Sequence, residues 1–400
     1  MSNLQQQDIL KMIGREAPIF DSDLAQREEA LSNLISESTF LVIGAAGSIG
    51  SAVVRELFKR QPKRLLAVDI SENNLAELVR HLRSSDGYIS GDFRTFCLDA
   101  LGPEFDAFCK QWPQHDYVLN FSALKHVRSE KDPFTLMRLI RTNIFLTKRT
   151  LEFANNCGAK KYFCVSTDKA TNPVNMMGAS KRIMEMFLNR YAKIPVSSAR
   201  FANVAFSDGS LLHSFRNRIA KRQPIAAPND VKRYFVTDTE GATLCLFSTL
   251  FGQDRDIFFP RLTANLHLET FDQIARRFLE SHGLTAHPCQ SEDEARASVE
   301  SLGAEKKWPC FFFASDTTGE KPFEEFFTET ETVDWDSFNE VGIVKNESTA
   351  SDSDLENFID SINSMLSKGS WSKEELVKLF TTLLPNFHHE EMGRNLDGKM

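Results

Sequence analysis

Residues 39–57 read TFLVIGAAGSIGSAVVREL, an apolar run that passes directly into a glycine-rich turn and then into a helical pattern. Three glycines, Gly44, Gly47 and Gly50, have the spacing G-x-x-G-x-x-G. A sharp strand-to-helix turn needs residues without Cβ, so that backbone N–H groups and the helix N-terminus can approach a pyrophosphate. The stretch therefore predicts a dinucleotide site, in which we include Ser48 and Ile49 between the last two glycines.

Similar strand-like runs alternate with helical patterns as far as position 260. This alternation predicts a parallel, doubly wound α/β sheet. The expected strands are TFLVIG (39–44), RLLAVDI (64–70), RTFCLD (94–99), YVLNFSA (117–123), KKYFCVST (160–167), VSSARFANV (196–204) and DIFFP (256–260).

The second expected strand ends in Asp69, nineteen residues past Gly50, where a carboxylate can accept hydrogen bonds from an adenosine ribose. The next five residues, 70–74, contain no Arg or Lys to receive a 2′-phosphate. NAD is therefore favoured over NADP as the cofactor. Asp99 ends the third strand and is a candidate for the adenine amino group, and Ser122, at the end of the fourth strand, is also placed in the cofactor site.

The chain divides into four parts by pattern and composition. Residues 1–38 form a helical lead-in, and residues 39–260 form the dinucleotide-binding domain, with parts of 205–240 contributing to a substrate site. Residues 261–345, where the periodicity weakens, are expected to be a smaller α+β substrate domain. Residues 346–400 read as a polar linker and C-terminal helices, the first with a capping box at residues 353–356 and the second beginning at Ser372.

Composition limits the classes of function. The mass is 45.4 kDa and the formal net charge is −8, which argues against a general nucleic-acid binder. Seven cysteines without a C-x-x-C pair indicate reduced thiols rather than a disulfide framework or zinc site. No signal peptide or membrane-spanning run is found, so a cytoplasmic protein is expected. The run of residues 388–391, HHEE, is interpreted as solvated, and no metal site is predicted.

The glycine spacing is typical of short-chain dehydrogenase/reductase proteins of the extended type. Their active site carries Tyr-x-x-x-Lys on a helix and a Ser or Thr at the end of the preceding strand. Here Lys181 has Met177 four residues before it, and the preceding strand ends in Thr167, Asp168 and Lys169. Methionine cannot exchange a proton, so the usual phenol is missing. The three remaining titratable groups, Asp168, Lys169 and Lys181, keep an acid and a base within reach.

With these residues, the chain resembles the UDP-N-acetylglucosamine 4,6-dehydratases of bacterial polysaccharide and glycan biosynthesis. Met177 resembles the branch that retains configuration at C5, since the inverting branch has Tyr at this position. The resemblance implies NAD as cofactor, UDP-N-acetylglucosamine as substrate, hydro-lyase activity and a homo-oligomer. It covers most of residues 7–330 through the stretches ILKMIGREAPIF, GAAGSIGSAVVREL, ALKHV, STDKATNPVNMMGASKR, SARFANVAFSDGS, VKRYFVT and GEKPFEE.

The resemblance also implies roles for residues. The sugar is oxidised at C4, loses its C5 proton and its 6-hydroxyl as water, and is reduced at C6. Asp168 is implied as the acid for the leaving hydroxyl and Lys169 as the base at C5. Further implied contacts are Thr167 with the 4-hydroxyl, Lys181 with the nicotinamide ribose, Lys125 and His126 with substrate or nicotinamide, Asn203 with the substrate, Lys232 and Arg233 with the diphosphate, and Glu324 or Glu325 with the uridine ribose.

Several questions stay open at this stage. Without a tyrosine, the O4 proton must leave through Thr167, Asp168 or a water. The family usually has G-N-V where this chain has Ala202-Asn203-Val204. An Arg commonly precedes P-G-E-K in the family, whereas the stretch here is Thr317-Thr318-Gly319-Glu320-Lys321. The alternatives are a 4-epimerase, a C5-inverting dehydratase, and a catalytically inactive NAD-binding regulatory protein.

Overall fold

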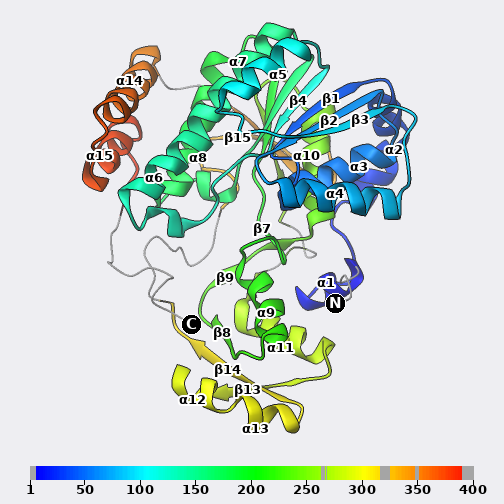
Figure 1. The fold of residues 1–400 in the computed structure, drawn as a ribbon, viewed down its shortest axis with the longest axis vertical. Helices are drawn as coiled ribbons and strands as arrows, with labels where there is room; N and C mark the ends of the chain where they lie inside the picture. The colour runs from blue at the N-terminus through cyan, green and yellow to red at the C-terminus, as the bar shows by residue number, and fades with distance from the viewer. Residues whose placement is uncertain (1–5, 263–265, 267, 316–324, 347–350, 390–400) are drawn as a thin grey trace.

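A nine-stranded sheet forms the centre of the larger of two lobes (Figure 1). The computed structural model describes residues 6–262, 266, 268–315, 325–346 and 351–389. The strands stand in the order β15 (Thr332–Asp334), β16 (Val341–Lys345), β11 (Asp256–Pro260), β6 (Val196–Ala199), β5 (Lys161–Val165), β4 (Tyr117–Asn120), β1 (Thr39–Ile43), β2 (Arg64–Asp69) and β3 (Asp92–Cys97).

Neighbouring strands from β11 to β3 are parallel, whereas β15 and β16 join antiparallel at one edge. The predicted doubly wound sheet is confirmed, and each of the seven expected strands is present. The chain runs outward from β1 to β3 and then returns to place β4 on the other side of β1. Ligands of such sheets bind at the carboxyl ends of the strands beside this reversal.

Helices cover both faces of the sheet because its strands are apolar on both sides. One face packs against α2 (Asp21–Ser36), α3 (Ser48–Lys59), α4 (Glu72–Ser85) and α10 (Asp238–Phe251). The other face packs against α5 (Pro103–Gln111), α7 (Leu146–Cys157) and α8 (Met176–Tyr191). A 3₁₀ turn at Val127–Glu130, α6 (Pro133–Ile140) and a π-helical turn at Arg141–Phe145 lead from β4 into α7.

The smaller lobe is built around a three-stranded parallel sheet, which lies below the large lobe in Figure 1. Its strands are β13 (Thr285–Cys289), β14 (Lys307–Phe313) and β8 (Ile225–Pro228). Its helices are α9 (Leu211–Ala220), α11 (Phe271–Ser281), α12 (Glu292–Ala297) and α13 (Val299–Ala304). Two short pairs, β7 (Asn203–Val204) with β10 (Phe235–Val236) and β9 (Lys232–Arg233) with β12 (Glu269–Thr270), lie in the segments that connect the lobes.

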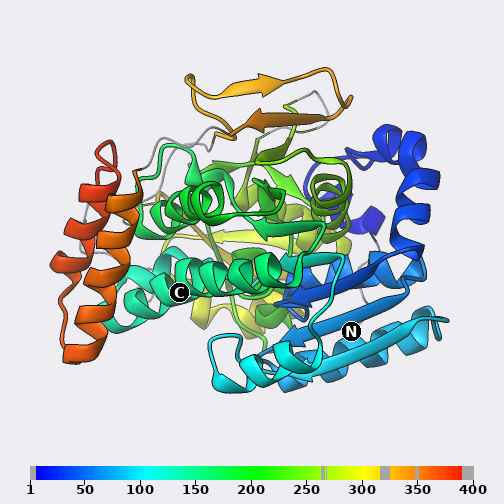
Figure 2. The same cartoon turned by 90° about the horizontal axis from the view of Figure 1, so that it is seen from above.

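The predicted domain boundary between residues 260 and 261 does not match the way the strands pair. Residues 332–345 return to the main sheet as β15 and β16, which lie along one edge of the molecule in Figure 2. Conversely, α9 and β8 precede residue 260 but belong to the smaller lobe. The sequence pattern missed this exchange because strand pairing between distant parts of the chain leaves no local signal.

The lead-in joins both lobes. Helix α1 (Gln6–Met12) packs its apolar face into the core of the smaller lobe, whereas α2 packs on the main sheet. Between them, Arg15 makes a bidentate pair with Glu240 at the start of α10, with N–O distances of 2.9 and 2.5 Å. Both side chains are almost fully buried. A buried bidentate pair fixes the direction of the chain as it passes from one lobe to the other.

The C-terminal helices pack on the same chain. Helix α14 (Asp352–Lys368) is capped by Ser351, whose hydroxyl accepts from the Asp354 N–H. The cap lies two residues before Ser353, where the capping box was predicted. Helix α15 (Lys373–Leu383) follows Ser372, where the second helix was predicted to begin, and Ser372 forms a capping box with Glu375. Both helices bury apolar side chains against α6 and α8. Within the described ranges, no helix is both long and apolar enough to cross a bilayer.

Candidate active site

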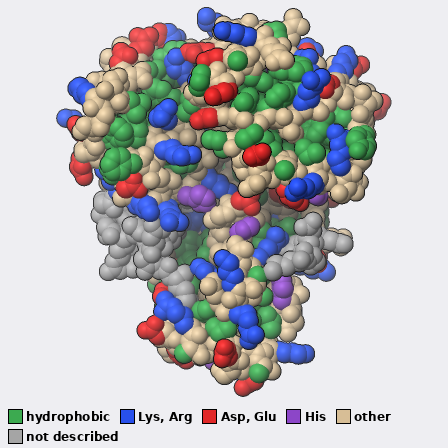
Figure 3. Space-filling view, viewed as in Figure 1, with side chains coloured by type: hydrophobic (Ala, Val, Ile, Leu, Met, Phe, Trp, Pro, Cys, Tyr) green, Lys and Arg blue, Asp and Glu red, His purple; other side chains and the backbone are tan. Residues whose placement is uncertain are grey.

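Several predicted site residues lie at or just after the ends of β1, β2, β4 and β5, beside the hollowed waist between the lobes. Figure 3 shows Lys, Arg and His side chains along this waist, although the whole chain carries a net charge of −8. A cleft lined by positive groups attracts anionic ligands, including phosphates.

Two glycines of the glycine-rich turn leave no room for a Cβ, whereas the third has open space above its backbone. Gly44 has φ +74°, and a Cβ there would lie 2.6 Å from the Ser122 backbone nitrogen. A Cβ on Gly50 would lie 2.0 Å from the Gly44 oxygen, so neither position accepts another residue. Above Gly47, by contrast, the nearest atom is the Gly44 oxygen at 3.6 Å. This open backbone at the start of α3 fits the close approach of a pyrophosphate.

Asp69 spans this turn. One carboxylate oxygen accepts from the Ala46 N–H and the other from the Ser71 N–H, each at 2.9 Å. The carboxylate is thus oriented and only 9% exposed, and its remaining lone pairs suit ribose hydroxyls. Asp99 lies on the exposed loop after β3 and accepts from the Leu101 N–H. The Ser122 N–H donates to Asn120 Oδ1 at 3.0 Å.

The residues after β5 bring an acid and an amine together. Lys169 Nζ lies 3.1 Å from Asp168 Oδ1, and the Thr167 hydroxyl donates to the same oxygen at 2.8 Å. Asp168 is 1% exposed, and no described group bonds its other oxygen, Oδ2. A buried carboxylate oxygen without a partner costs free energy, which a hydroxyl of a bound ligand would recover.

Lys181 and Met177 lie on α8 beside this strand end. Lys181 is 3% exposed and donates to the Val165 carbonyl at 3.0 Å. Burial lowers the pKa of Lys181, and the nearby Cys164 and Glu185 oppose that change. Met177 is also 3% exposed and belongs to the apolar cluster that α6, α8 and the C-terminal helices share. Its side chain is therefore a packed core residue at the edge of the site.

Lys125 and His126 follow β4 and contact the turn at residues 206–209. Lys125 Nζ donates to the Ser207 hydroxyl at 3.2 Å. His126 Nε2 lies against Gly209, where a Cβ would come within 2.9 Å. Both residues are exposed overall, yet desolvation of the amine lowers the pKa of Lys125. Desolvation also lowers the pKa of His126, with the charges of Lys125 and Arg128 adding to the effect.

The remaining substrate candidates lie on the segments that connect the lobes. Asn203 begins β7, and its buried Nδ2 has no bond to the described part of the chain. Lys232 is exposed, whereas Arg233 is 5% exposed and donates to the Lys232 carbonyl. Glu325 is exposed and accepts from Asn172 Nδ2 at 3.2 Å. Glu324 and the stretch before it, residues 316–323, lie outside the described residues.

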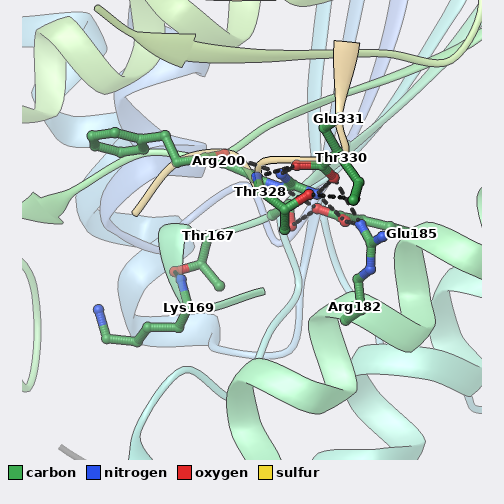
Figure 4. Close-up of polar contacts among 10 residues, drawn as sticks. Thr167, Lys169, Arg182, Glu185, Arg200, Thr328, Thr330 and Glu331 are labelled. Carbon is green, nitrogen blue, oxygen red and sulfur yellow. Dashed lines mark hydrogen bonds and ion pairs between the residues drawn. The ribbon is translucent and has the colours of Figure 1, made fainter. Parts of the chain in front are cut away.

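Sequence reasoning missed a group of charged side chains behind the strand end (Figure 4). Glu185 lies on α8 one turn beyond Lys181, and Arg200 follows β6. Ser166, directly before Thr167, donates to Glu185 at 2.6 Å. A glutamate in an amphipathic helix usually lies on the solvated face, so the sequence carried no signal of its burial.

The HHEE run is only partly described. His389 Nε2 lies 3.1 Å from Glu130 Oε2, and both side chains are buried. Glu390 and Glu391 fall outside the described residues. Among the residues that the structure describes, no group of three or more His, Cys, Asp or Glu side chains could hold a metal ion.

Comparison with known proteins identifies the family. The model of the family described as "Polysaccharide biosynthesis protein" matches residues 40–346, which include the whole site. The chain belongs to this family. The chain is similar to the capsular polysaccharide biosynthesis protein CapD of Staphylococcus aureus, 30% identical over 64% of this chain and 42% of CapD. The probable polysaccharide biosynthesis protein EpsC of Bacillus subtilis is 31% identical over 62% of this chain and 40% of EpsC.

The chain thus spans about two fifths of the length of CapD and EpsC. It spans 69% of the uncharacterized membrane protein MJ1061 of Methanocaldococcus jannaschii, which is 33% identical over 58% of this chain.

Solved structures share the fold. Pen from Bacillus thuringiensis superposes with a TM-score of 0.63, at 21% identity, over 88% of this chain and 98% of Pen. A double mutant of the dTDP-glucose 4,6-dehydratase DesIV from Streptomyces venezuelae, crystallised with NAD, gives a TM-score of 0.55 at 17% identity over 72% of this chain and 87% of DesIV. UDP-glucose 4-epimerase from Thermotoga maritima gives 0.52 at 17% identity over 73% of this chain and 90% of the epimerase. This chain therefore shares the fold of these nucleotide-sugar dehydratases and epimerases.

Proposed function

We propose that this family member is an NAD-dependent nucleotide-sugar 4,6-dehydratase that converts UDP-N-acetylglucosamine to a UDP-4-keto-6-deoxy-N-acetylhexosamine with C5 configuration retained. One observation carries the proposal: Asp168 and Lys169 form a close pair, and Asp168 Oδ2 is buried without a described partner. Dehydration needs both an acid for a leaving hydroxyl and a base for the C5 proton, and this pair supplies both.

The cofactor assignment rests on the glycine-rich turn. The N–H groups at Gly47, Ser48 and Ile49 would hold the pyrophosphate, and Asp69 the adenosine ribose. Lys181, at the other end of the site, would hold the nicotinamide ribose. Bound NAD would supply reversible hydride storage between C4 and C6 of the sugar.

The proton transfers follow from the strand-end geometry. In the proposed complex the 4-hydroxyl would contact the Thr167 hydroxyl, which donates to Asp168, so that the O4 proton would pass through Thr167 to the carboxylate. Asp168 then gives this proton to the leaving 6-hydroxyl, which departs as water. Lys169, as the uncharged amine, takes the C5 proton and later returns a proton to C5. Because each proton has a donor and an acceptor in this arrangement, no tyrosine is required.

The remaining groups would bind the substrate. The cations Lys232 and Arg233 suit a diphosphate. Asn203, whose buried amide nitrogen has no bond among the described residues, suits a polar group of the sugar or uracil. Lys125 and His126 would contact the sugar, and Glu324 or Glu325 the uridine ribose. The family resemblance supports a homo-oligomer for the assembled enzyme.

The decisive experiment is incubation with UDP-N-acetylglucosamine in D₂O, followed by NMR of the product. We expect a 4-keto-6-deoxy sugar with retained C5 configuration and deuterium at C5, because a proton held on an amine exchanges with solvent. The hydrogen moved from C4 to C6 should be undiluted. A C5-inverted product would contradict the branch assignment.

A 4-epimerase is the main rival, since UDP-glucose 4-epimerases share both the fold and weak sequence similarity. Asp168 and Lys169 favour dehydration because an epimerase has no hydroxyl to expel. Formation of the C4 epimer without loss of water would support the rival. Bound NAD without turnover would support an inactive NAD-binding protein.

A further inference from the structure

Four charged side chains form a closed group behind the strand-end site (Figure 4). Arg200 makes bidentate contacts with Glu185, at 2.9 and 2.7 Å. The same guanidinium makes a second bidentate contact with Glu331, at 2.9 and 2.8 Å. Arg182 closes the group, with its Nη1 3.1 Å from both carboxylates. Arg200 is fully buried and Glu185 is 2% exposed.

The group is internally neutral. Burial raises the pKa of Glu185, but the charges and hydrogen bonds of Arg200 outweigh it, so the pKa is lowered overall and the carboxylate is ionised. The same balance lowers the pKa of Glu331 to about 2. Two carboxylates thus face two guanidinium groups. Burying charge is costly, and this geometry recovers the cost only while all four members are present.

Glu185 differs from Glu331 because it also faces the site. Its Oε1 accepts from the Ser166 hydroxyl at 2.6 Å, and Ser166 leads directly into the Thr167–Lys169 stretch. It also lies one helical turn beyond Lys181 on α8, and its charge opposes the lowering of the Lys181 pKa by burial. The other titratable group that acts on Lys181 is the thiol of Cys164 on β5.

We propose that Glu185 is a positioning residue of the active site: it fixes Ser166 at the end of β5 and balances the positive charge of Lys181. Its effect on turnover rests on the proposed dehydratase function, whereas its effect on cofactor binding does not. Glu331 serves a different purpose in the same group. It accepts from the Thr328 N–H at 2.9 Å, and its partner Arg200 donates to the Phe326 carbonyl, so these contacts hold residues 326–331 in place.

This difference supplies a matched pair of variants. Glu185→Gln and Glu331→Gln each remove one negative charge from the same group and each weaken the contacts of Arg200. Only the first alters a group that bonds Ser166 and whose charge acts on Lys181. We expect both variants to lose stability in urea. NAD affinity, measured by calorimetry from pH 6 to pH 10, should separate them.

In wild type, NAD affinity should fall at alkaline pH as Lys181 loses its proton. In Glu185→Gln this fall should move to lower pH, because the charge that favours the ammonium is gone. In Glu331→Gln it should stay where it is in wild type. Equal behaviour of the two variants would show that Glu185 is only a structural member of the group and would overturn the proposal.

Ser166→Ala tests whether Glu185 acts by fixing Ser166, and it does so without removing any charge. It removes one hydroxyl and leaves the four-charge group intact, so the protein should fold even if Glu185→Gln does not. We expect kcat to fall about tenfold with KM nearly unchanged, since the hydroxyl positions catalytic groups rather than substrate. An unchanged kcat would overturn the claim that Glu185 positions the site through Ser166. If wild type shows no dehydratase activity, the proposed function fails, while the pH dependence of NAD affinity still tests Glu185.

Discussion

Lys169 Nζ lies 3.1 Å from Asp168 Oδ1, so two consecutive residues at the end of β5 form an acid–amine pair. The amine side chain is 17% exposed and the carboxylate side chain 1% exposed. The pair therefore opens toward the waist on the lysine side, where a ligand can reach it. The Thr167 hydroxyl completes the arrangement by donating to the same carboxylate oxygen.

Replacing either member should stop dehydration. Lys169→Ala removes the base and Asp168→Asn removes the acid, so each should lower turnover by roughly 10²–10⁴-fold. NAD binding should stay nearly intact, because neither side chain belongs to the glycine-rich turn. Turnover is measured by NMR of the product, and NAD affinity by calorimetry. Lys193→Ala, on an exposed loop, is the matched control. Near-normal turnover in a folded Lys169→Ala protein would remove the role assigned to this amine.

NADP should bind at least about tenfold more weakly than NAD, because the Asp69 carboxylate would face a 2′-phosphate. Asp69 is held in place by the Ala46 and Ser71 N–H groups and so cannot easily turn away. Residues 70–74 offer no cation in compensation. Calorimetric titration of the cofactor-free protein with each nucleotide measures the ratio. Equal affinities would mean that Asp69 does not face the ribose.

The sheet could be predicted from the sequence because each strand is marked by a local run of apolar residues. Apolar runs such as 64–69 end at polar residues. The backbone of the turn itself requires glycine at 44, where φ is +74°, and at 50, where a Cβ would lie 2.0 Å from the Gly44 oxygen. The strand-end stretch could be predicted for the same reason, since Thr167, Asp168 and Lys169 are consecutive.

Features that join distant parts of the chain could not be predicted. The pairing of β11 with β16 joins two segments that are separated by α11, β13, α12, α13 and β14 of the smaller lobe. Arg200 meets Glu331 across a still longer stretch of the chain. The position of Met177 illustrates the same limit. Its spacing from Lys181 marked it as a site residue, but its packing against the C-terminal helices, the first of which begins at Asp352, was visible only in the structure.

Acid should destabilise wild type more than Glu331→Gln. The pKa of Glu331 is lowered to about 2 in the folded protein, against an ordinary value near 4.5. A lowered carboxyl pKa gives stability that is complete above the unfolded value and is lost as pH falls through the folded value. Wild type should therefore lose more free energy of unfolding between pH 5 and pH 3 than the variant. Urea unfolding at pH 7, 5, 4 and 3 measures this, and parallel curves for the two proteins would contradict it.

Phe380→Ala should detach the C-terminal helices from the large lobe. Phe380 is fully buried and meets Phe358 edge to face, with ring centroids 5.5 Å apart. Loss of a buried phenylalanine costs about 3–5 kcal/mol of unfolding free energy, so the packing of these two helices on the large lobe should be lost first. We expect a lower urea midpoint or a separate first transition. Lys378→Ala, on the exposed side of the same helix, should leave the midpoint unchanged. Equal midpoints for both variants would show that the helices do not depend on this contact.

Met177→Tyr should fail to accelerate the reaction, although it restores the residue that related enzymes place four before the lysine. Met177 is 3% exposed within the apolar cluster of α6, α8 and the C-terminal helices, and its N–H donates to Glu130 at 3.2 Å. A larger ring there overpacks the cluster at a cost of about 1–3 kcal/mol, and its hydroxyl would lack a partner if buried.

The measurements for Met177→Tyr are the urea midpoint and turnover with UDP-N-acetylglucosamine. Met176→Leu, a change of similar volume at a neighbouring buried position, should cost less than about 1.5 kcal/mol and keep normal turnover. If Met177→Tyr turned over faster than wild type, a phenol would be reaching the 4-hydroxyl. The O4 proton would then have a better route than Thr167 and Asp168, and the relay proposed for this site would have to be abandoned.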